Sequence, residues 1–507
     1  MKAADLFKVR DERIKVLHLT MIAFFITFVT WFNMAPLATT MMDDLGWMTK
    51  QHTAVLGLLN VALTVPARVI IGGLLDRFGP RKVFSILLIG MSIPTFVFAF
   101  GDSWAQLAIS RLLLSSIGAG FVIGIRMVSE WFPPKSVGFA EGFYAGWGNF
   151  GSAFAAMLLP WAALTLIGGD NGWRYAIALT GLICLVYGLI YYALVKDTPE
   201  NKAYFKPKKS SAMEVSSWGD LIQLIAWTVP LVGVLGLITW RIHGFNLLSG
   251  SVSTIIYVGL GFLLVYQIIR ILLVNMPILK KGVPQDDRYK FRNVAALNTT
   301  YFANFGAELA VVSMLPMFFQ TTFSLSPTKA GLIASCFAFV NLFARPIGGI
   351  LSDRMKNRKM VMLIYMTGIT LGFLSMGFMT EGFPLGAAVA LTILTSMFVQ
   401  GAEGSTFAII PMIKKRITGQ VAGMAGAYGN VGALTYLTIL TFVTPQQFFF
   451  VLASGALVSL IACATMLEEP KNAFGEDYEL SSVDQELISS SQKTAPSMTK
   501  VPAAATK

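Results

Sequence analysis

The chain has 507 residues, of which 55% are hydrophobic and only 13% are charged. The charged share is about half that of soluble domains, which excludes a disordered chain and an ordinary soluble enzyme. The net charge of +12 fits basic loops beside a membrane better than nucleic-acid binding, because no basic run is interleaved with aromatic residues. Cys184, Cys336 and Cys463 are scattered, so we expect neither disulfides nor a metal site.

Fourteen apolar stretches are long enough to cross a bilayer, which takes about 20 residues. They lie near 18–41, 53–75, 83–101, 105–128, 137–165, 173–195, 221–240, 252–278, 295–320, 329–351, 359–379, 385–412, 418–443 and 446–466. Lysine and arginine cluster in alternate loops along the whole chain. We therefore predict an all-α, multi-pass protein of the plasma (inner) membrane with both termini in the cytoplasm.

These stretches divide the chain into five expected parts. They are an N-terminus (1–17), a six-helix lobe (18–200), a linker (201–292), a second six-helix lobe (293–466) and a tail (467–507). The two apolar runs of the linker, 221–240 and 252–278, are expected to cross the membrane, although a pair of helices on the cytoplasmic membrane surface would preserve the same orientation. The tail is polar and Ser/Thr-rich, which predicts disorder in the cytoplasm.

The two six-helix parts carry related motifs. Arg68-Val-Ile-Ile-Gly72-Gly-Leu-Leu-Asp76-Arg77 matches Arg345-Pro-Ile-Gly-Gly349-Ile-Leu-Ser-Asp353-Arg354 in register. Gly148-Asn149-Phe-Gly151 and Gly429-Asn430-Val-Gly432 form a second pair at nearly the same offset. Parallel repeats of six spans are one way in which secondary transporters are built, with the site near the bilayer midplane where the halves meet.

The motifs also resemble those of a known family. Gly72-x-x-x-Asp76-Arg77-Phe-Gly79-Pro-Arg81 resembles the loop signature of the major facilitator superfamily, and Asp353-Arg354 looks like its second copy, without the loop glycine. The two Gly-Asn segments resemble the nitrate signatures of the nitrate/nitrite porter family, in particular its cyanobacterial permease type. The resemblance covers about 18–200 and 290–466. It implies two pseudo-symmetric six-helix lobes, here with a two-helix insertion between them.

Arg68 and Arg345 are the strongest candidates for a binding site. Arg68 lies eight residues before Asp76, about 12 Å into the membrane from the loop, and Arg345 has the equivalent depth. A guanidinium there costs at least about 2.5 kcal/mol, which is tolerated when it faces a cavity and meets an anion. Two such planar forks match a planar oxyanion. The alternative for each arginine is a structural bond to helix carbonyls or to a carboxylate.

Other intramembrane residues complete the predicted site. The resemblance implies that both arginines bind substrate and that Phe121, Tyr301 and Phe305 form an aromatic sandwich around the flat anion. Asn149 and Asn430 could donate to substrate or fix the arginines, because an amide inside a span needs partners. Glu308 and Glu403 could carry a proton, or serve only as structural partners of Arg345. Arg126 and Glu130 are expected to pair with each other as i,i+4 neighbours.

We therefore expect a secondary transporter that imports nitrate, and nitrite, by alternating access with protons as coupling ion. The alternatives are nitrate/nitrite exchange, transport of another small anion, or an anion sensor that signals through its tail. No enzyme motif and no P-loop occurs in the sequence, so we expect neither catalysis nor a cofactor. The expected partners are nitrate, nitrite, protons and the lipid bilayer. We expect the chain to be a monomer, with a regulatory partner binding its cytoplasmic tail.

Overall fold

A computed structural model of the chain describes residues 3–200, 202, 204, 212–325, 327–440 and 442–494. Regular structure in these residues is helical, with no strand among them. Thirteen helical segments there are long and apolar enough to cross a membrane. The expected fourteenth span is also a helix, α17 (Thr418–Leu440). It is less apolar because it is rich in glycine, and it packs inside the bundle against α4 and α12.

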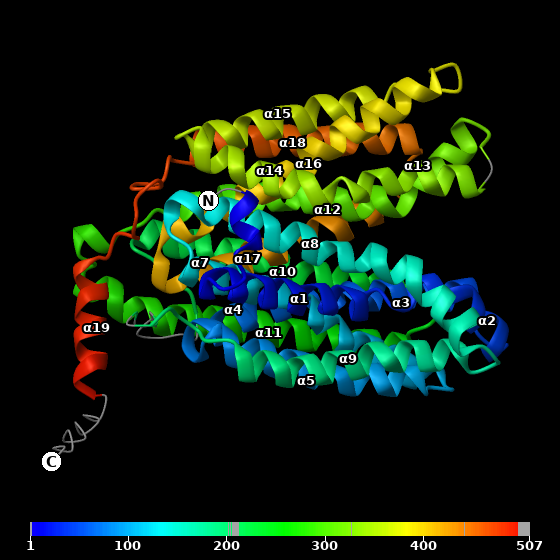
Figure 1. Cartoon of the computed structure of the whole chain (residues 1–507), viewed down its shortest axis with the longest axis horizontal. Helices are drawn as coiled ribbons and strands as arrows, with labels where there is room; N and C mark the ends of the chain where they lie inside the picture. The colour runs from blue at the N-terminus through cyan, green and yellow to red at the C-terminus, as the bar shows by residue number, and fades with distance from the viewer. Residues whose placement is uncertain are drawn as a thin grey trace, which may run out of the picture.

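Six spans form each lobe, and the two lobes lie side by side along the length of the molecule (Figure 1). The first lobe contains α1 (Glu12–Trp31), α2 (Ala38–Leu45), α3 (Lys50–Ala62), α4 (Thr64–Phe78), α5 (Pro80–Ala99), α6 (Trp104–Leu114), α7 (Gly120–Trp131), α8 (Pro134–Trp161) and α9 (Gly172–Leu194). The second contains α12 (Phe291–Thr322), α13 (Pro327–Phe339), α14 (Asn341–Arg354), α15 (Arg358–Met376), α16 (Leu385–Ile413), α17 and α18 (Pro445–Met466). The expected fold of two six-helix lobes is confirmed.

The second span of each lobe is broken at an equivalent position. Leu63 separates α3 from α4, and Val340 separates α13 from α14. Pro66 and Pro346 lie just beyond these breaks, where each removes a backbone donor and so weakens the local helix ladder. The pieces that follow the breaks, α4 and α14, carry the two candidate arginines. Each of these pieces also packs against the opposite lobe, α4 on α17 and α14 on α8.

The insertion consists of two long helices, α10 (Trp218–Gly244) and α11 (Gly250–Lys281). Both run alongside the other spans (Figure 1), and α10 contacts α3, α4, α12 and α17. The alternative of two helices lying across the end of the bundle does not fit this arrangement. Only 6% of the most apolar part of α11 is buried, as expected of a helix that faces lipid.

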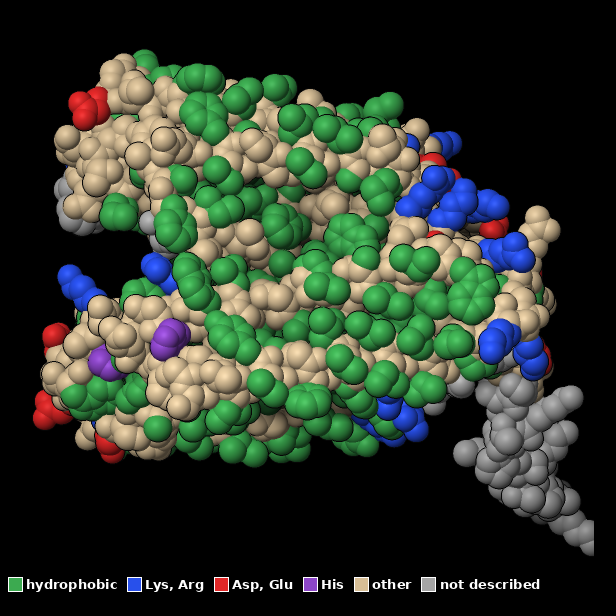
Figure 2. All heavy atoms as spheres, turned by 180° about the vertical axis from the view of Figure 1, so that it is seen from behind, with side chains coloured by type: hydrophobic (Ala, Val, Ile, Leu, Met, Phe, Trp, Pro, Cys, Tyr) green, Lys and Arg blue, Asp and Glu red, His purple; other side chains and the backbone are tan. Residues whose placement is uncertain are grey.

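One end of the bundle carries the loops rich in lysine and arginine, and we refer to it as the basic end (Figure 2). The tail lies against this end, and the expected disorder is wrong for its described part. The helix α19 (Ser482–Thr494) follows a segment that contacts both lobes. Asp484 pairs with Arg416 at 2.8 Å, and Lys135 pairs with Glu476. Charge complementarity with the basic loops orders a stretch that is too polar to form a core of its own. Residues 495–507 lie outside the described residues.

Candidate substrate site

Arg68 is fully buried between the two lobes. Its Nε donates to the carbonyl of Gly118 in the first lobe at 3.1 Å, and its Nη1 donates to the carbonyl of Gly426 in the second lobe at 2.5 Å. No described carboxylate forms an ion pair with it. Backbone carbonyls orient the guanidinium without cancelling its charge. Arg68 therefore keeps a full positive charge in a site from which water is excluded, where an anion would be attracted strongly.

Arg345 is equally buried, at 1% exposure, but it is surrounded by carboxylates. Its Nη2 lies 3.1 Å from Glu308 and also contacts Glu403. Asn341 donates to the other oxygen of Glu308 at 2.7 Å. Both acids that could carry a proton, Glu308 and Glu403, thus contact Arg345. This is the contact expected if they serve as structural partners of that arginine. The group of Arg345, Glu308 and Glu403 carries a net charge of −1 when both acids are ionised.

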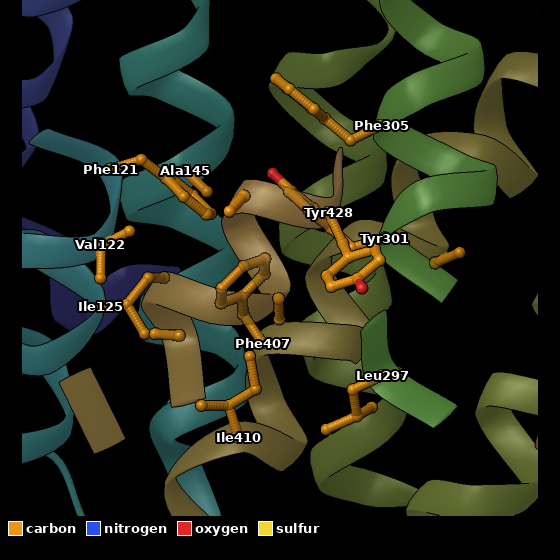
Figure 3. Packing of buried hydrophobic residues seen from close by; sticks show 14 of the residues in the cluster. Phe121, Val122, Ile125, Ala145, Leu297, Tyr301, Phe305, Phe407, Ile410 and Tyr428 are labelled. Carbon is orange, nitrogen blue, oxygen red and sulfur yellow. The ribbon is translucent and has the colours of Figure 1, made fainter. Parts of the chain in front are cut away.

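Aromatic rings lie beside both arginines, and Figure 3 shows three of these rings, Phe121, Tyr301 and Phe305. The rings of Phe121 and Tyr301 are parallel within 3° with centroids 6.0 Å apart, and Tyr301 stacks on Phe305 at 5.0 Å. The Arg68 guanidinium lies 5.3 Å from the centroid of Phe305, and that of Arg345 lies 6.0 Å from the same centroid. The three aromatic residues named by the resemblance therefore meet at the two arginines. Their flat faces can shape a slot for a flat ligand.

The two asparagines have different partners. With its amide oxygen facing the guanidinium, Asn149 accepts from both terminal nitrogens of Arg345, at 2.6 and 2.7 Å. Asn430 instead donates to the carbonyl of Gly426 at 3.2 Å, the same carbonyl that holds Arg68. The buried amide oxygen of Asn430 has no hydrogen-bond partner among the described residues. Asn149 thus fixes one arginine directly, whereas Asn430 reaches the other through a shared acceptor.

Glycines allow the lobes to approach each other beside both arginines. A Cβ on Gly142 would lie 2.5 Å from the carbonyl oxygen of Arg345, and one on Gly423 would lie 2.4 Å from that of Arg68. Helix backbones can come this close only where side chains are absent. Each arginine helix is thus pressed against a glycine helix of the opposite lobe.

The loop motif closes the basic end through two aspartates. Asp76 accepts from the backbone N–H groups of Gly419 and Gln420 at 3.0 and 2.9 Å. Asp353 accepts from those of Gly138 and Phe139 at 3.1 and 2.8 Å. Each aspartate satisfies backbone donors in the first turns of a helix of the opposite lobe. Together they hold both lobes shut at the basic end.

The remaining motif residues have local roles at this end. Gly79 has φ of 87° and joins α4 to α5 in a turn where a Cβ would collide with Asp197. A Cβ on Gly72 would lie 2.4 Å from the carbonyl oxygen of Gly419. Arg81 donates to the carbonyl of Tyr192 at 2.8 Å. Arg77 and Arg354 are exposed, outside the contact between the lobes.

A buried network of charged side chains reinforces the closure. Arg126 pairs with Glu130 at 3.1 Å, which confirms the predicted i,i+4 pair, and it also bonds the carbonyl of Lys415 in the second lobe. Lys415 lies 3.3 Å from Glu130 and over the ring of Tyr478 in the tail. Burial lowers the pKa of the Lys415 ammonium to about 7, against the attraction of Glu130. At the end opposite the basic loops, by contrast, a hollow separates the lobes (Figure 2).

Sequence reasoning missed several contributors to the site. Phe407 packs edge-on against both Phe121 and Tyr301, at 4.5 and 4.8 Å. Asn341 orients Glu308, and a lone amide in an apolar span could have indicated this role. The two acceptors of Arg68 are backbone carbonyls, which every residue has, so the sequence could not indicate them. Among the described residues, no group of three or more His, Cys, Asp or Glu side chains could hold a metal ion.

Comparison with known proteins agrees with this architecture. The family described as Major Facilitator Superfamily matches residues 20–284 and 297–499. The structure of the proton:xylose symporter XylE is similar with a TM-score of 0.61, and the match covers 91% of this chain and 97% of that chain at 14% identity. At this identity the likeness shows the fold alone.

Two curated relatives are much more similar in sequence. The nitrate/nitrite transporter NrtP of a Picosynechococcus species is 46% identical, over 92% of this chain and 95% of its own length. The protein of the same name from Nostoc punctiforme is 44% identical with the same coverage. The chain therefore belongs to the Major Facilitator Superfamily, and within it to the nitrate/nitrite porter family that its Gly-Asn segments resemble. The relatives are named as transporters, and the chain is a multi-pass integral membrane protein.

Proposed function

We propose that this chain is a secondary active transporter, not an enzyme, that imports nitrate and nitrite by alternating access, with protons as coupling ion. The observation that carries the proposal is the position of Arg68, a buried guanidinium held by carbonyls of both lobes and left without a carboxylate partner among the described residues. A single uncompensated charge beside stacked rings suits a small, flat, singly charged anion. Two relatives named as nitrate/nitrite transporters support the same substrate class.

The charge balance favours a monoanion over a dianion. Arg68 and Arg345 supply two positive charges, and Glu308 and Glu403 supply two negative charges when ionised. One nitrate would leave the buried group at −1, and a dianion would leave it at −2. Burying uncompensated charge is costly, so the monoanion is the better fit. Phosphate or a larger organic anion would need more cations than these four residues provide.

Alternating access is supported by the contrast between the two ends. The basic end is closed by paired aspartates and glycine contacts, whereas the opposite end is hollowed between the lobes (Figure 2). The closing contacts include hydrogen bonds from backbone N–H groups to Asp76 and Asp353, which water could replace when the lobes rock. With the basic end and both termini in the cytoplasm, as the distribution of lysine and arginine predicts, this state would admit substrate from outside.

Proton coupling is supported by the two acids on Arg345. Protonation of either acid would compensate the charge of a bound nitrate, because it removes one negative charge from the same buried group. Import of a monoanion against a membrane potential costs about 2.3 kcal/mol per 100 mV. Two protons per anion would reverse that sign, and the site offers two acids to carry them. Nitrate/nitrite exchange, the second candidate, is electroneutral and would need no proton.

The test is uptake of labelled nitrate into proteoliposomes that contain the purified full chain. One set receives an inward proton gradient, one contains internal nitrite without a gradient, and one has neither. We expect accumulation above equilibrium only with the gradient. Accumulation that ignores the gradient but requires internal nitrite would make the protein an exchanger. A folded protein that moves no nitrate under any condition would overturn the proposal in favour of another anion or a sensor.

A further inference from the structure

A groove of about 460 Å³ lies between the first lobe and the insertion helices. Its lining comes from α4, α10, α11 and the first turns of α17, together with Ala212 and Met213. Most of its lining is apolar, including Pro66, Ile70, Leu74, Leu224, Leu231 and Leu263. Its volume lies in the range of ligand pockets.

The groove has the depth of one membrane leaflet. Along α4 it extends from Arg77, in the last turn at the basic end, to Pro66. The eleven steps between these two residues rise about 16 Å. The hydrocarbon core of a bilayer is about 30 Å thick, so the groove runs from the basic surface to about the midplane. A lipid tail that starts at that surface has the same reach.

The end of the groove at the basic surface is polar and positively charged. Arg77 and Arg270 line it, and no described carboxylate lines the groove or pairs with either arginine. Gln420 lies beside them and is only 6% exposed, yet both polar atoms of its side chain lack a hydrogen-bond partner in the described part of the chain. A buried amide with unmet donors and acceptors points to a missing polar ligand.

We infer that this groove binds an anionic phospholipid from the leaflet at the basic end. The phosphate would lie between the Arg77 and Arg270 guanidinium groups and accept from the Gln420 amide, while an acyl chain fills the apolar length. Basic pockets between membrane helices are suited to such headgroups, and guanidinium groups bind phosphate through charge-assisted hydrogen bonds. An uncharged lipid or an apolar helix would leave both arginines and Gln420 without compensation.

The bound lipid would also act on the transport cycle. Arg77 lies on α4 of the first lobe, and Gln420 lies on α17 of the second. These helices meet at the basic end, where the neighbouring Asp76 accepts from the backbone of Gln420 at 2.9 Å. A phosphate held by both helices would stabilise the state in which this end is closed. The inference does not depend on which anion is transported.

The test is native mass spectrometry of the full chain released from nanodiscs that contain phosphatidylglycerol or phosphatidylcholine. We expect one phosphatidylglycerol to remain bound after bulk lipid is stripped, and no phosphatidylcholine. Arg77→Gln and Arg270→Gln should each weaken retention about fivefold, and the double variant about 25-fold. Lys281→Gln removes a cation at the last residue of α11, eleven residues beyond Arg270 and outside the groove, and should change nothing.

A steric pair of variants keeps the test decisive if the charge variants fold poorly. Leu263→Trp should fill the groove and expel the lipid, whereas Phe262→Trp, on the neighbouring exposed position outside the lining, should not. Equal retention of phosphatidylcholine, retention unchanged in Leu263→Trp, or a lipid-free dimer in place of a lipid-bound chain would each overturn the inference.

Discussion

The two lobes share a framework but differ in the chemistry of their arginines. In each lobe a broken second span presents an arginine, a glycine of the other lobe packs on that arginine's backbone, and an aspartate further along the same helix caps a helix of the other lobe. Arg68, however, donates to two backbone carbonyls and forms no ion pair with a described carboxylate, whereas Arg345 contacts Glu308, Glu403 and the amide oxygen of Asn149. The repeat therefore fixes where the arginines lie and leaves their charge environments free to differ.

This difference suggests a division of labour. An arginine without acids attracts the anion whatever the pH, whereas an arginine with two acids responds to protons. Both guanidinium groups approach the same Phe305 ring, so the two functions would act on one bound ligand.

Replacing either arginine by lysine should abolish transport. Arg68→Lys and Arg345→Lys each lose the planar fork and the charge-assisted hydrogen bonds that depend on it. Such bonds contribute about 1.5–3 kcal/mol each, so we expect uptake to fall on the order of 100-fold. The measurement is initial nitrate uptake in proteoliposomes at equal protein content. Arg241→Lys, at the end of α10 away from the site, should behave like the unaltered chain. Normal affinity in either site variant would remove that arginine from the site.

Replacing either acid by glutamine should remove proton coupling while the anion can still cross the membrane. At an imposed gradient of one pH unit, each coupled proton contributes about a tenfold accumulation ratio. Glu308→Gln and Glu403→Gln should therefore lower the steady-state accumulation of nitrate about tenfold per proton lost, while nitrate/nitrate counterflow persists. Glu381→Gln, on an exposed loop, is the control. Unchanged accumulation in both variants would leave the acids with a purely structural role beside Arg345.

Much of this framework could be predicted from the sequence. Hydropathy located the spans, and the repeat of Arg, Gly and Asp in register paired the lobes and identified both arginines. The resemblance named three aromatic residues, which stack on one another beside the arginines. The Arg126–Glu130 pair followed from helical spacing alone. All of these features depend on local periodicity or on residue identity at fixed offsets.

The rest depends on how the lobes dock. The acceptors of Arg68 are backbone carbonyls that any residue could supply, one of them far away in the other lobe. The contacts of Asp76 with Gly419 and Gln420 likewise join distant parts of the chain. The tail was expected to be disordered because of its composition, but its Asp484 forms a buried ion pair with Arg416 of the second lobe. Such long-range pairings leave no local pattern in the sequence.

The capping aspartates offer a test of the symmetry at the basic end. Asp76→Asn and Asp353→Asn each weaken two hydrogen bonds to backbone N–H groups of the opposite lobe. We expect each to destabilise the closed state by about 1–2 kcal/mol. The measurement is the distance distribution between spin labels at positions 82 and 360, in a chain without its native cysteines. Longer distances in only one of the two variants would show that a single aspartate holds the closure.

The smallest expected effect is a pH dependence of the closed state that arises from Lys415. This residue differs from its counterpart in the first lobe. Burial lowers its pKa to about 7 from an ordinary 10.5, whereas Lys135, in the corresponding loop of the first lobe, is exposed. Below pH 7 the Lys415 ammonium is charged in both the closed and the open state, so the burial penalty is fully present. As the pH rises from about 7 toward 10.5, the closed state holds a neutral amine and the open state an ammonium, so closure becomes more favourable.

The same spin-label distances should therefore shift toward the closed state between about pH 7 and pH 9 in the unaltered chain. Lys415→Met should remove that shift, because no group at this position then titrates. Lys135→Met should leave it intact, since an exposed lysine carries its proton in both states across this range. A shift that survives in Lys415→Met would assign the pH dependence to other groups at the basic end. If the shift is lost in Lys415→Met but kept in Lys135→Met, the pH dependence of closure comes from the buried lysine of the second lobe and not from its counterpart in the first.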